Sequence, residues 1–348
     1  MVQGAAGQRN RGGVGQHGEA PGRGFESWST AVLPGASHPS ITGPTATALS
    51  CKISLEKAQW KHQRRYGGTG EAATVDWRVL SLRSVGGDHE RTDPGGPGLQ
   101  EFAGTSWLAG APYLAHVLDS IPAQLRSARL MALGPGVDSG EHSDYKYGPL
   151  WGTARLHVPI TTTPGAKLHL EGTPHQWQPG TLWFGDFSRT HRVQNEDDVP
   201  RVHLVIDTLV SRQLLDLFPA EQREQFLDAA LVNRWPVGLS ATELSAYRLR
   251  CAMPASFLDW TEEDGDFQRP EDPRRDVTLD VQDGRLVLSV DDVPTIALVP
   301  VSNDEFRFVG WTDERTIRVE RIDGQAYLAL RTRTGPAVRE LRVLGSDL

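Results

Sequence analysis

The chain has 348 residues and a formal net charge of -8, which is enough length for one large domain with a smaller one or for two domains of ordinary size. Acidic and basic residues are mixed along it, which argues weakly against a nucleic-acid-binding protein. No run of about 18 apolar residues occurs, so we expect no transmembrane helix, and the first residues lack the apolar stretch of a signal peptide. The two cysteines, Cys51 and Cys251, lie far apart, so we expect no disulfide framework and a reducing, cytoplasmic location.

Residues 1–72 are rich in Gly, Ser, Thr, Ala and Arg and show no sustained periodicity. Such a segment cannot bury enough apolar surface to offset the entropy lost on ordering. We therefore predict a disordered tail, or a stretch added by a start codon assigned too far upstream. The short basic run at 61–65 fits a solvated tail better than a nucleic-acid site.

Residues 73–210 have the pattern of many short strands with turn residues between them. Periodicity predicts a helix over 112–122. The predicted strands cover 75–80, 128–133, 154–160, 166–171, 181–185 and 201–208. Short strands at close, regular spacing indicate a mainly β fold of the jelly-roll kind.

Beyond residue 210 the pattern changes twice. Residues 211–275 hold apolar residues at helical spacing and then a Trp- and acid-rich connection, which predicts a helical segment and linker. Residues 276–348 alternate apolar and polar residues, and Gln282-Asp283-Gly284 is a strong hairpin signal. We expect a small antiparallel β domain there.

His142, Asp144 and His191 form the most informative group of the chain. His142 and Asp144 are two positions apart, so their side chains share one face of an extended segment. A distant histidine can then close the site from another strand. Two imidazoles and one carboxylate on one face of an octahedron bind non-heme Fe(II) and leave positions open for oxygen and a co-substrate.

Arg201 follows His191 by ten positions. A guanidinium pairs with a carboxylate through two hydrogen bonds, so Arg201 would suit a dicarboxylate such as 2-oxoglutarate. Arg155 and His157 alternate with Leu156 and Val158 and therefore share one strand face. If that face is inward, the two polar side chains need partners, and either an anionic ligand or a carboxylate of the protein would serve.

These residues lie in motifs that resemble the aspartyl/asparaginyl β-hydroxylase and proline cis-hydroxylase family of Fe(II)/2-oxoglutarate-dependent dioxygenases. The resemblance is close over about a quarter of the chain, within residues 128–208. The matching segments are Gly136–Asp144, Arg155–Ile160, Pro179–Phe184, Thr190–Asn195 and Arg201–Asp207.

The resemblance implies a double-stranded β-helix and a hydroxylase that uses Fe(II), 2-oxoglutarate and O2 and releases succinate and CO2. His142, Asp144 and His191 match the iron ligands, Arg201 and His157 match residues that bind the co-substrate, and Arg155 matches a position associated with a substrate carboxylate. The animal enzymes lack the acidic ligand, so Asp144 brings the chain closer to bacterial amino-acid hydroxylases. The expected substrate is an amino acid or a peptide, with no nucleic acid or membrane as partner.

Two other functions remain open at this stage. A cupin-like metal enzyme without 2-oxoglutarate would use the same three ligands, and Arg201 would then hold another anion. A ligand-binding module could use the β-rich fold for recognition, although it would have no need of an open metal site. Oxygen consumption or succinate release, with and without 2-oxoglutarate, separates these alternatives.

Overall fold

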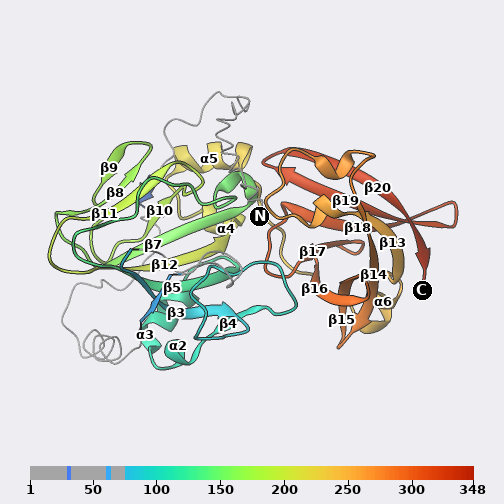
Figure 1. Cartoon of the computed structure of the whole chain (residues 1–348), viewed down its shortest axis with the longest axis horizontal. Coiled ribbons are helices and arrows are strands. Elements are labelled where there is room, and N and C mark those ends of the chain that lie inside the picture. The colour runs from blue at the N-terminus through green and yellow to red at the C-terminus, as the bar shows by residue number, and fades with distance from the viewer. Residues whose placement is uncertain (1–29, 33–59, 64–74) are drawn as a thin grey trace, which may run out of the picture.

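The computed structural model describes residues 30–32, 60–63 and 75–348. Two β-rich bodies lie side by side along the long axis of the molecule (Figure 1). The first contains an open two-sheet structure and the second a closed barrel. Within these described ranges, no helix is long and apolar enough to cross a membrane.

The first body is a double-stranded β-helix of two antiparallel sheets. The large sheet has the order β1 (Thr30–Val32), β10 (Trp183–Gly185), β7 (Thr153–Thr161), β12 (Arg201–Leu209), β5 (Leu125–Leu133), β3 (Trp77–Val85) and β2 (Lys61–His62), with β4 (Phe102–Gly104) paired to β3. The small sheet has the order β6 (Val137–Asp138), β11 (His191–Asn195), β8 (Ala166–Leu170) and β9 (Thr173–His175). The predicted fold, mainly β and of the jelly-roll kind, is confirmed.

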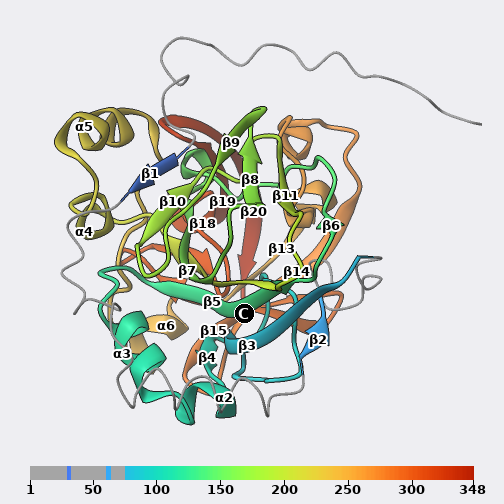
Figure 2. The same cartoon turned by 90° about the vertical axis from the view of Figure 1, so that its left-hand side faces the viewer.

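Alternation along the strands of the large sheet separates an apolar outer face from a polar inner face. Leu130, Leu156 and Ile206 face outward and are fully buried in the main core. Their cover comes from α2 (Ser106–Ala109), α3 (Pro112–Asp119), α4 (Arg212–Leu215) and α5 (Ala220–Ala229), and Figure 2 shows α3, α4 and α5 along one side of the molecule. The inner face is therefore free to carry the charged and imidazole side chains of a site.

The second body is a closed antiparallel barrel, preceded by α6 (Ala241–Ser245). Its strands are β13 (Leu249–Pro254), β14 (Arg274–Gln282), β15 (Arg285–Val290), β16 (Val293–Pro300), β17 (Glu305–Phe308), β18 (Arg315–Ile322), β19 (Gln325–Thr334) and β20 (Ala337–Asp347). Three 3-10 turns complete the described elements: η1 (Pro149–Trp151), η2 (Ala255–Leu258) and η3 (Asp266–Gln268). Buried Phe257, Phe267, Phe306 and Phe308 help to fill the interior, so the barrel is a packed core.

The predicted hairpin at Gln282-Asp283-Gly284 joins β14 to β15, where Gln282 pairs with Arg285. Asp283 and Gly284 have φ of 49° and 75°, the left-handed pair that a two-residue hairpin turn requires.

The structure differs from the sequence expectation at two boundaries. The barrel begins at β13 rather than at residue 276, because β13 pairs with both β14 and β20 and closes the barrel. The expected helical segment and linker at 211–275 therefore contains a barrel strand.

Most of the expected tail, 1–72, lies outside the described residues. Two short pieces of it, however, are strands of the large sheet: β1 pairs with β10 and β2 pairs with β3. Edge strands this short carry too few residues to show an alternation pattern in the sequence.

Candidate metal centre

His142 and His191 are brought together by a two-residue bridge between the loop after β6 and the start of β11. The amide N of His142 donates to the carbonyl O of His191 at 2.9 Å, and the reverse bond is 2.8 Å. Asp144 lies two residues beyond His142, and its amide N donates to the carbonyl O of Phe187 at 2.8 Å. One ligand atom from each of His142, Asp144 and His191 lies within 4.8 Å of the others, so the three predicted ligands can hold one ion.

Both imidazoles are oriented by carbonyl groups of their own loops. His142 Nδ1 lies 3.0 Å from the carbonyl O of Gly140, and His191 Nδ1 lies 2.9 Å from that of Arg189. We assign Nδ1 as the protonated nitrogen in each ring, which leaves the Nε2 lone pair for a metal. Burial lowers the pKa of His191 to about 4, although the charge of Asp144 opposes the shift. The ring is therefore neutral at pH 7, as metal binding requires.

Asp144 is held as a carboxylate. Burial would raise its pKa, but the charge of Arg155, with smaller effects from the two histidines, keeps that pKa below its ordinary value. Arg155 Nη1 donates to Asp144 Oδ2. Two imidazole nitrogens and one carboxylate oxygen are the donor set that non-heme Fe(II) takes, so the residues present fit that ion.

Arg155 also bonds a second carboxylate, that of Asp207 on β12. Arg155 Nε donates to Asp207 Oδ1 at 2.6 Å, while Arg129 Nη2 and Ser127 Oγ donate to Asp207 Oδ2 at 3.0 and 2.7 Å. Burial would raise the pKa of Asp207, but the two guanidinium groups hold it well below its usual range. The protein itself thus supplies carboxylate partners to Arg155, one of the two alternatives that the sequence left open. A contact between Arg155 and a substrate carboxylate stays a prediction.

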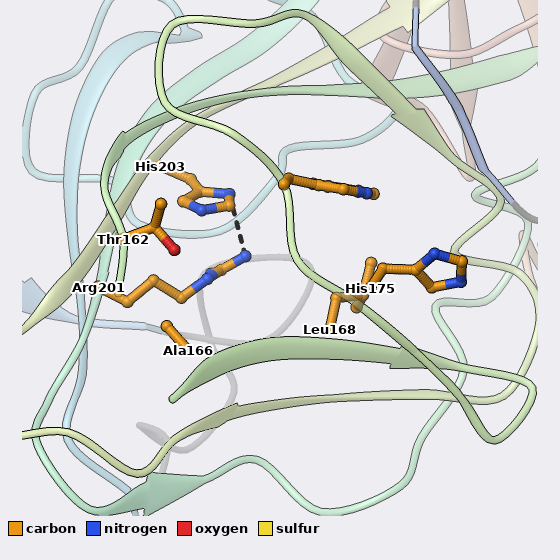
Figure 3. A pocket seen from close by; sticks show the side chains of 7 residues that line it. Thr162, Ala166, Leu168, His175, Arg201 and His203 are labelled. Atoms are coloured by element: carbon orange, nitrogen blue, oxygen red, sulfur yellow. Dashed lines mark hydrogen bonds between the residues drawn. The ribbon is translucent and has the colours of Figure 1, made fainter. Parts of the chain in front are cut away.

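Arg201 lies at the other end of the same inner face and is 4% exposed. Its Nη2 lies 3.0 Å from His203 Nδ1, and among the described residues no carboxylate pairs with it. Burial lowers the pKa of Arg201 to about 9. A small pocket surrounds it, lined by Thr162, Ala166, Leu168, His175, Trp177, Arg201 and His203, and Figure 3 shows its guanidinium extended toward His203. A buried cation without a counter-charge is the environment that an anionic ligand would complete.

His157 connects the two ends of the site. Its ring stacks on Phe187 at 4.9 Å between centroids, and Phe187 meets His191 edge-on, also at 4.9 Å. On the other side, His157 Nδ1 lies 3.3 Å from His203 Nδ1. Its Nε2 is buried with no hydrogen-bond partner. Burial, and then the charge of Arg201, hold the pKa of His157 well below its ordinary value, so the ring is neutral.

Gly148 allows the two ligand-bearing loops to approach. A Cβ at this position would lie 2.4 Å from Ser188 Oγ and 2.6 Å from Asp186 Oδ1. The loop that follows Asp144 therefore packs directly on the loop that precedes His191, and a side chain at residue 148 would separate them.

Three residues of the site were given no role from the sequence. His203 and Asp207 lie two and six positions beyond Arg201 on β12, so they share its inward face, and this spacing could have identified them. Phe187 carries no comparable signal, because its position beside His157 and His191 depends on how the loop folds.

Comparison with known proteins agrees with the motifs. Residues 46–210 match the family model described as aspartyl/asparaginyl beta-hydroxylase. A search among curated proteins found no match.

Three solved structures illustrate the similarity. An oxidoreductase of the 2OG-Fe(II) oxygenase family from Burkholderia pseudomallei is 12% identical, with 52% of this chain and 85% of that chain covered and a TM-score of 0.36. A predicted oxalate decarboxylase from Thermotoga maritima is 14% identical, with 44% and 96% covered and a TM-score of 0.24. A cupin domain from Bordetella pertussis Tohama I is 22% identical, with 25% and 85% covered and a TM-score of 0.20.

The chain thus combines a jelly-roll domain with two histidines and one aspartate that could hold one ion. Residues 46–210 of this chain are similar to the aspartyl/asparaginyl beta-hydroxylase family, whose model they match. The match begins at residue 46, within the range 1–72 for which a tail was expected.

Proposed function

We propose that the protein is an Fe(II)/2-oxoglutarate-dependent dioxygenase that hydroxylates an amino acid, or an amino-acid residue of a peptide, and releases succinate and CO2. The observation that carries the proposal is the pairing of the His142, Asp144 and His191 group with the buried Arg201, which has no carboxylate partner among the described residues. A metal site alone fits many enzymes of this fold, whereas a neighbouring buried cation in need of an anion favours a dicarboxylate co-substrate.

Each residue has a defined task in this proposal. His142, Asp144 and His191 bind the metal, and the carbonyls of Gly140 and Arg189 orient the two imidazoles. Arg201, with His203 behind it, binds the distal carboxylate of 2-oxoglutarate, and His157 borders the space between that carboxylate and the metal. Iron with 2-oxoglutarate and O2 supplies the oxidising power to hydroxylate an unactivated C–H bond.

The aromatic rings around His157 keep the co-substrate end dry. Trp177 lies 5.1 Å from His157 and stacks on Trp183 at 5.4 Å between centroids, and Phe187 covers the opposite side. Excluding water strengthens the attraction between Arg201 and a bound carboxylate. Arg155, anchored on Asp207, keeps the Asp144 carboxylate ionised and turned toward the metal.

The direct test is succinate release by the purified full chain with Fe(II), O2 and 2-oxoglutarate, screened against free amino acids and short peptides. We expect at least one substrate to stimulate succinate formation. The variants His142→Ala and His191→Ala should abolish it, while His116→Ala, at an exposed position of α3, should leave it unchanged.

Omission of 2-oxoglutarate separates this function from a metal enzyme that needs no co-substrate. Turnover that continues without 2-oxoglutarate, or normal turnover by either ligand variant, would contradict the proposal.

A further inference from the structure

The turn that carries Asp144 has an unusual conformation. The amide N of Tyr147 donates to the carbonyl O of Asp144 at 3.1 Å and closes the turn. The third residue of the turn, Lys146, has a φ of 57°, a region where glycine is the usual choice. A lysine persists there only if other contacts hold it.

Those contacts come from the second body. The Lys146 side chain is 1% exposed, and its Nζ donates to Glu314 Oε1 and to the carbonyl O of Glu262, both at 2.9 Å. Glu314 lies between β17 and β18 and is itself 3% exposed. The ion pair is therefore fully buried and joins the metal-ligand loop to the barrel.

Glu314 and the carbonyl of Glu262 are fixed by their own neighbours. Trp311 Nε1 donates to Glu314 Oε2 at 2.7 Å. Arg315 Nη2 donates to the carbonyl O of Glu262 at 3.2 Å, and Arg315 Nη1 donates to the carbonyl O of Asp259 at 2.6 Å. Lys146 thus docks on groups with little freedom to move.

The barrel also holds the far end of the same loop. Thr312 Oγ1 donates to the carbonyl O of Trp151 at 2.6 Å, and the amide N of Gly335 donates to the carbonyl O of Leu150 at 2.7 Å. The segment 144–151 is therefore fastened to the barrel at Lys146 and again at its end.

We propose that Glu314 is a positioning residue for Asp144, acting through Lys146, so that the C-terminal barrel is a structural part of the metal centre. The inference rests on the proposed function in one respect, that Asp144 is a metal ligand. Loss of the Glu314 charge leaves the buried ammonium group of Lys146 with the carbonyl O of Glu262 but without its carboxylate partner. Lys146 then leaves its site, the turn relaxes, and the carboxylate of Asp144 moves away from the two imidazoles.

Anaerobic titration of the full chain with Co(II), without 2-oxoglutarate or substrate, tests this through the visible absorption of the bound ion. Glu314→Gln keeps the shape of the side chain and an acceptor for Trp311 but removes the charge. We expect Co(II) affinity to fall by about 10-fold or more, the range seen when a residue that orients a metal ligand is lost, with a changed spectrum.

Adding Lys146→Gly to Glu314→Gln removes the unpaired ammonium and suits the positive φ of the turn. This double variant should recover affinity, and it also serves as the test protein if Glu314→Gln alone does not fold. Asp291→Asn breaks an exposed ion pair of the barrel, with Arg275, and is the control that should leave Co(II) binding unchanged.

A lower melting temperature for Glu314→Gln with unchanged Co(II) affinity and spectrum would overturn the inference, because it would limit Glu314 to folding stability. A double variant that binds Co(II) no better than Glu314→Gln would also overturn the inference. Failure of the wild-type chain to bind Co(II) at all would instead remove the proposed function itself.

Discussion

Replacing Arg201 with methionine removes a buried charge and keeps an unbranched side chain in the pocket. The pKa of Arg201 falls from 12.5 to about 9 because of burial. One pKa unit corresponds to about 1.4 kcal/mol, so the unpaired guanidinium destabilises the fold by up to ~5 kcal/mol at neutral pH. The bond to His203 is lost with the charge, and such a bond contributes about 1–3 kcal/mol. We therefore expect Arg201→Met to raise the free energy of unfolding of the ligand-free protein by ~2 kcal/mol.

The sign of the pH dependence follows from the direction of the shift. Below about pH 9 the guanidinium is charged in both the folded and the unfolded chain, so the destabilisation is complete. Above about pH 9 the folded state releases the proton, and the advantage of Arg201→Met should shrink. Urea unfolding of both proteins at pH 7 and pH 10 measures this difference.

In contrast to the ligand-free comparison, 2-oxoglutarate should stabilise the wild-type chain and not Arg201→Met. With Mn(II) under argon, 2-oxoglutarate at about 100 times its Kd should stabilise the wild-type chain by ~2.7 kcal/mol and leave Arg201→Met unchanged. Arg250→Met, at an arginine whose side chain is largely exposed, is the control and should behave like the wild type. Destabilisation of the ligand-free protein by Arg201→Met, or protection of that variant by 2-oxoglutarate, would refute this prediction.

Three further predictions concern buried groups elsewhere. Asp207→Asn should destabilise the fold by about 3–5 kcal/mol in urea unfolding, because two buried arginines lose their shared carboxylate; a change below about 1 kcal/mol would contradict this. Burial raises the pKa of the Cys251 thiol to about 12. In a Cys51→Ser background, a thiol reagent at pH 8 should therefore react with Cys251 only after unfolding. Rapid labelling of the native protein would contradict this. Bonds from arginines hold the pKa of Glu305 below its ordinary value against the effect of burial, so the stabilisation from Glu305 is present above about pH 4.5 and is lost as the pH falls. In Glu305→Gln, the free energy of unfolding should therefore fall less steeply as the pH is lowered. An unchanged acid dependence in this variant would contradict the prediction.

The sequence could predict elements whose pattern is local, but not those that depend on contacts between residues far apart in the chain. Strands such as β7 and β12 carry nine residues each, long enough for alternation to show. Strand β13 has six residues between a helical and a loop-like segment, and only its pairing with β14 and β20 makes it part of the barrel. Local patterning contains no record of such long-range pairing.

The candidate site divides in the same way. The spacing of His142 and Asp144 is local, and the structure brings both beside His191. The contact between Lys146 and Glu314 joins residues 168 positions apart, and neither residue stands out in the sequence. A lysine two positions after a candidate metal ligand is ordinary until its positive φ and its partner are known.

Strand β12 shows how one face of a strand serves both stability and binding. Asp207 and Arg201 lie on the same inward face, six positions apart, at opposite ends of the strand. At the Asp207 end, two buried arginines share one carboxylate and the charges are balanced within the protein. At the Arg201 end, the described residues supply no carboxylate, only the nitrogen of His203. A fold selected for stability alone would pair or replace a buried guanidinium that costs several kcal/mol. The uncompensated positive charge at the Arg201 end, beside the balanced cluster at the Asp207 end, supports the proposal that an anionic ligand binds Arg201.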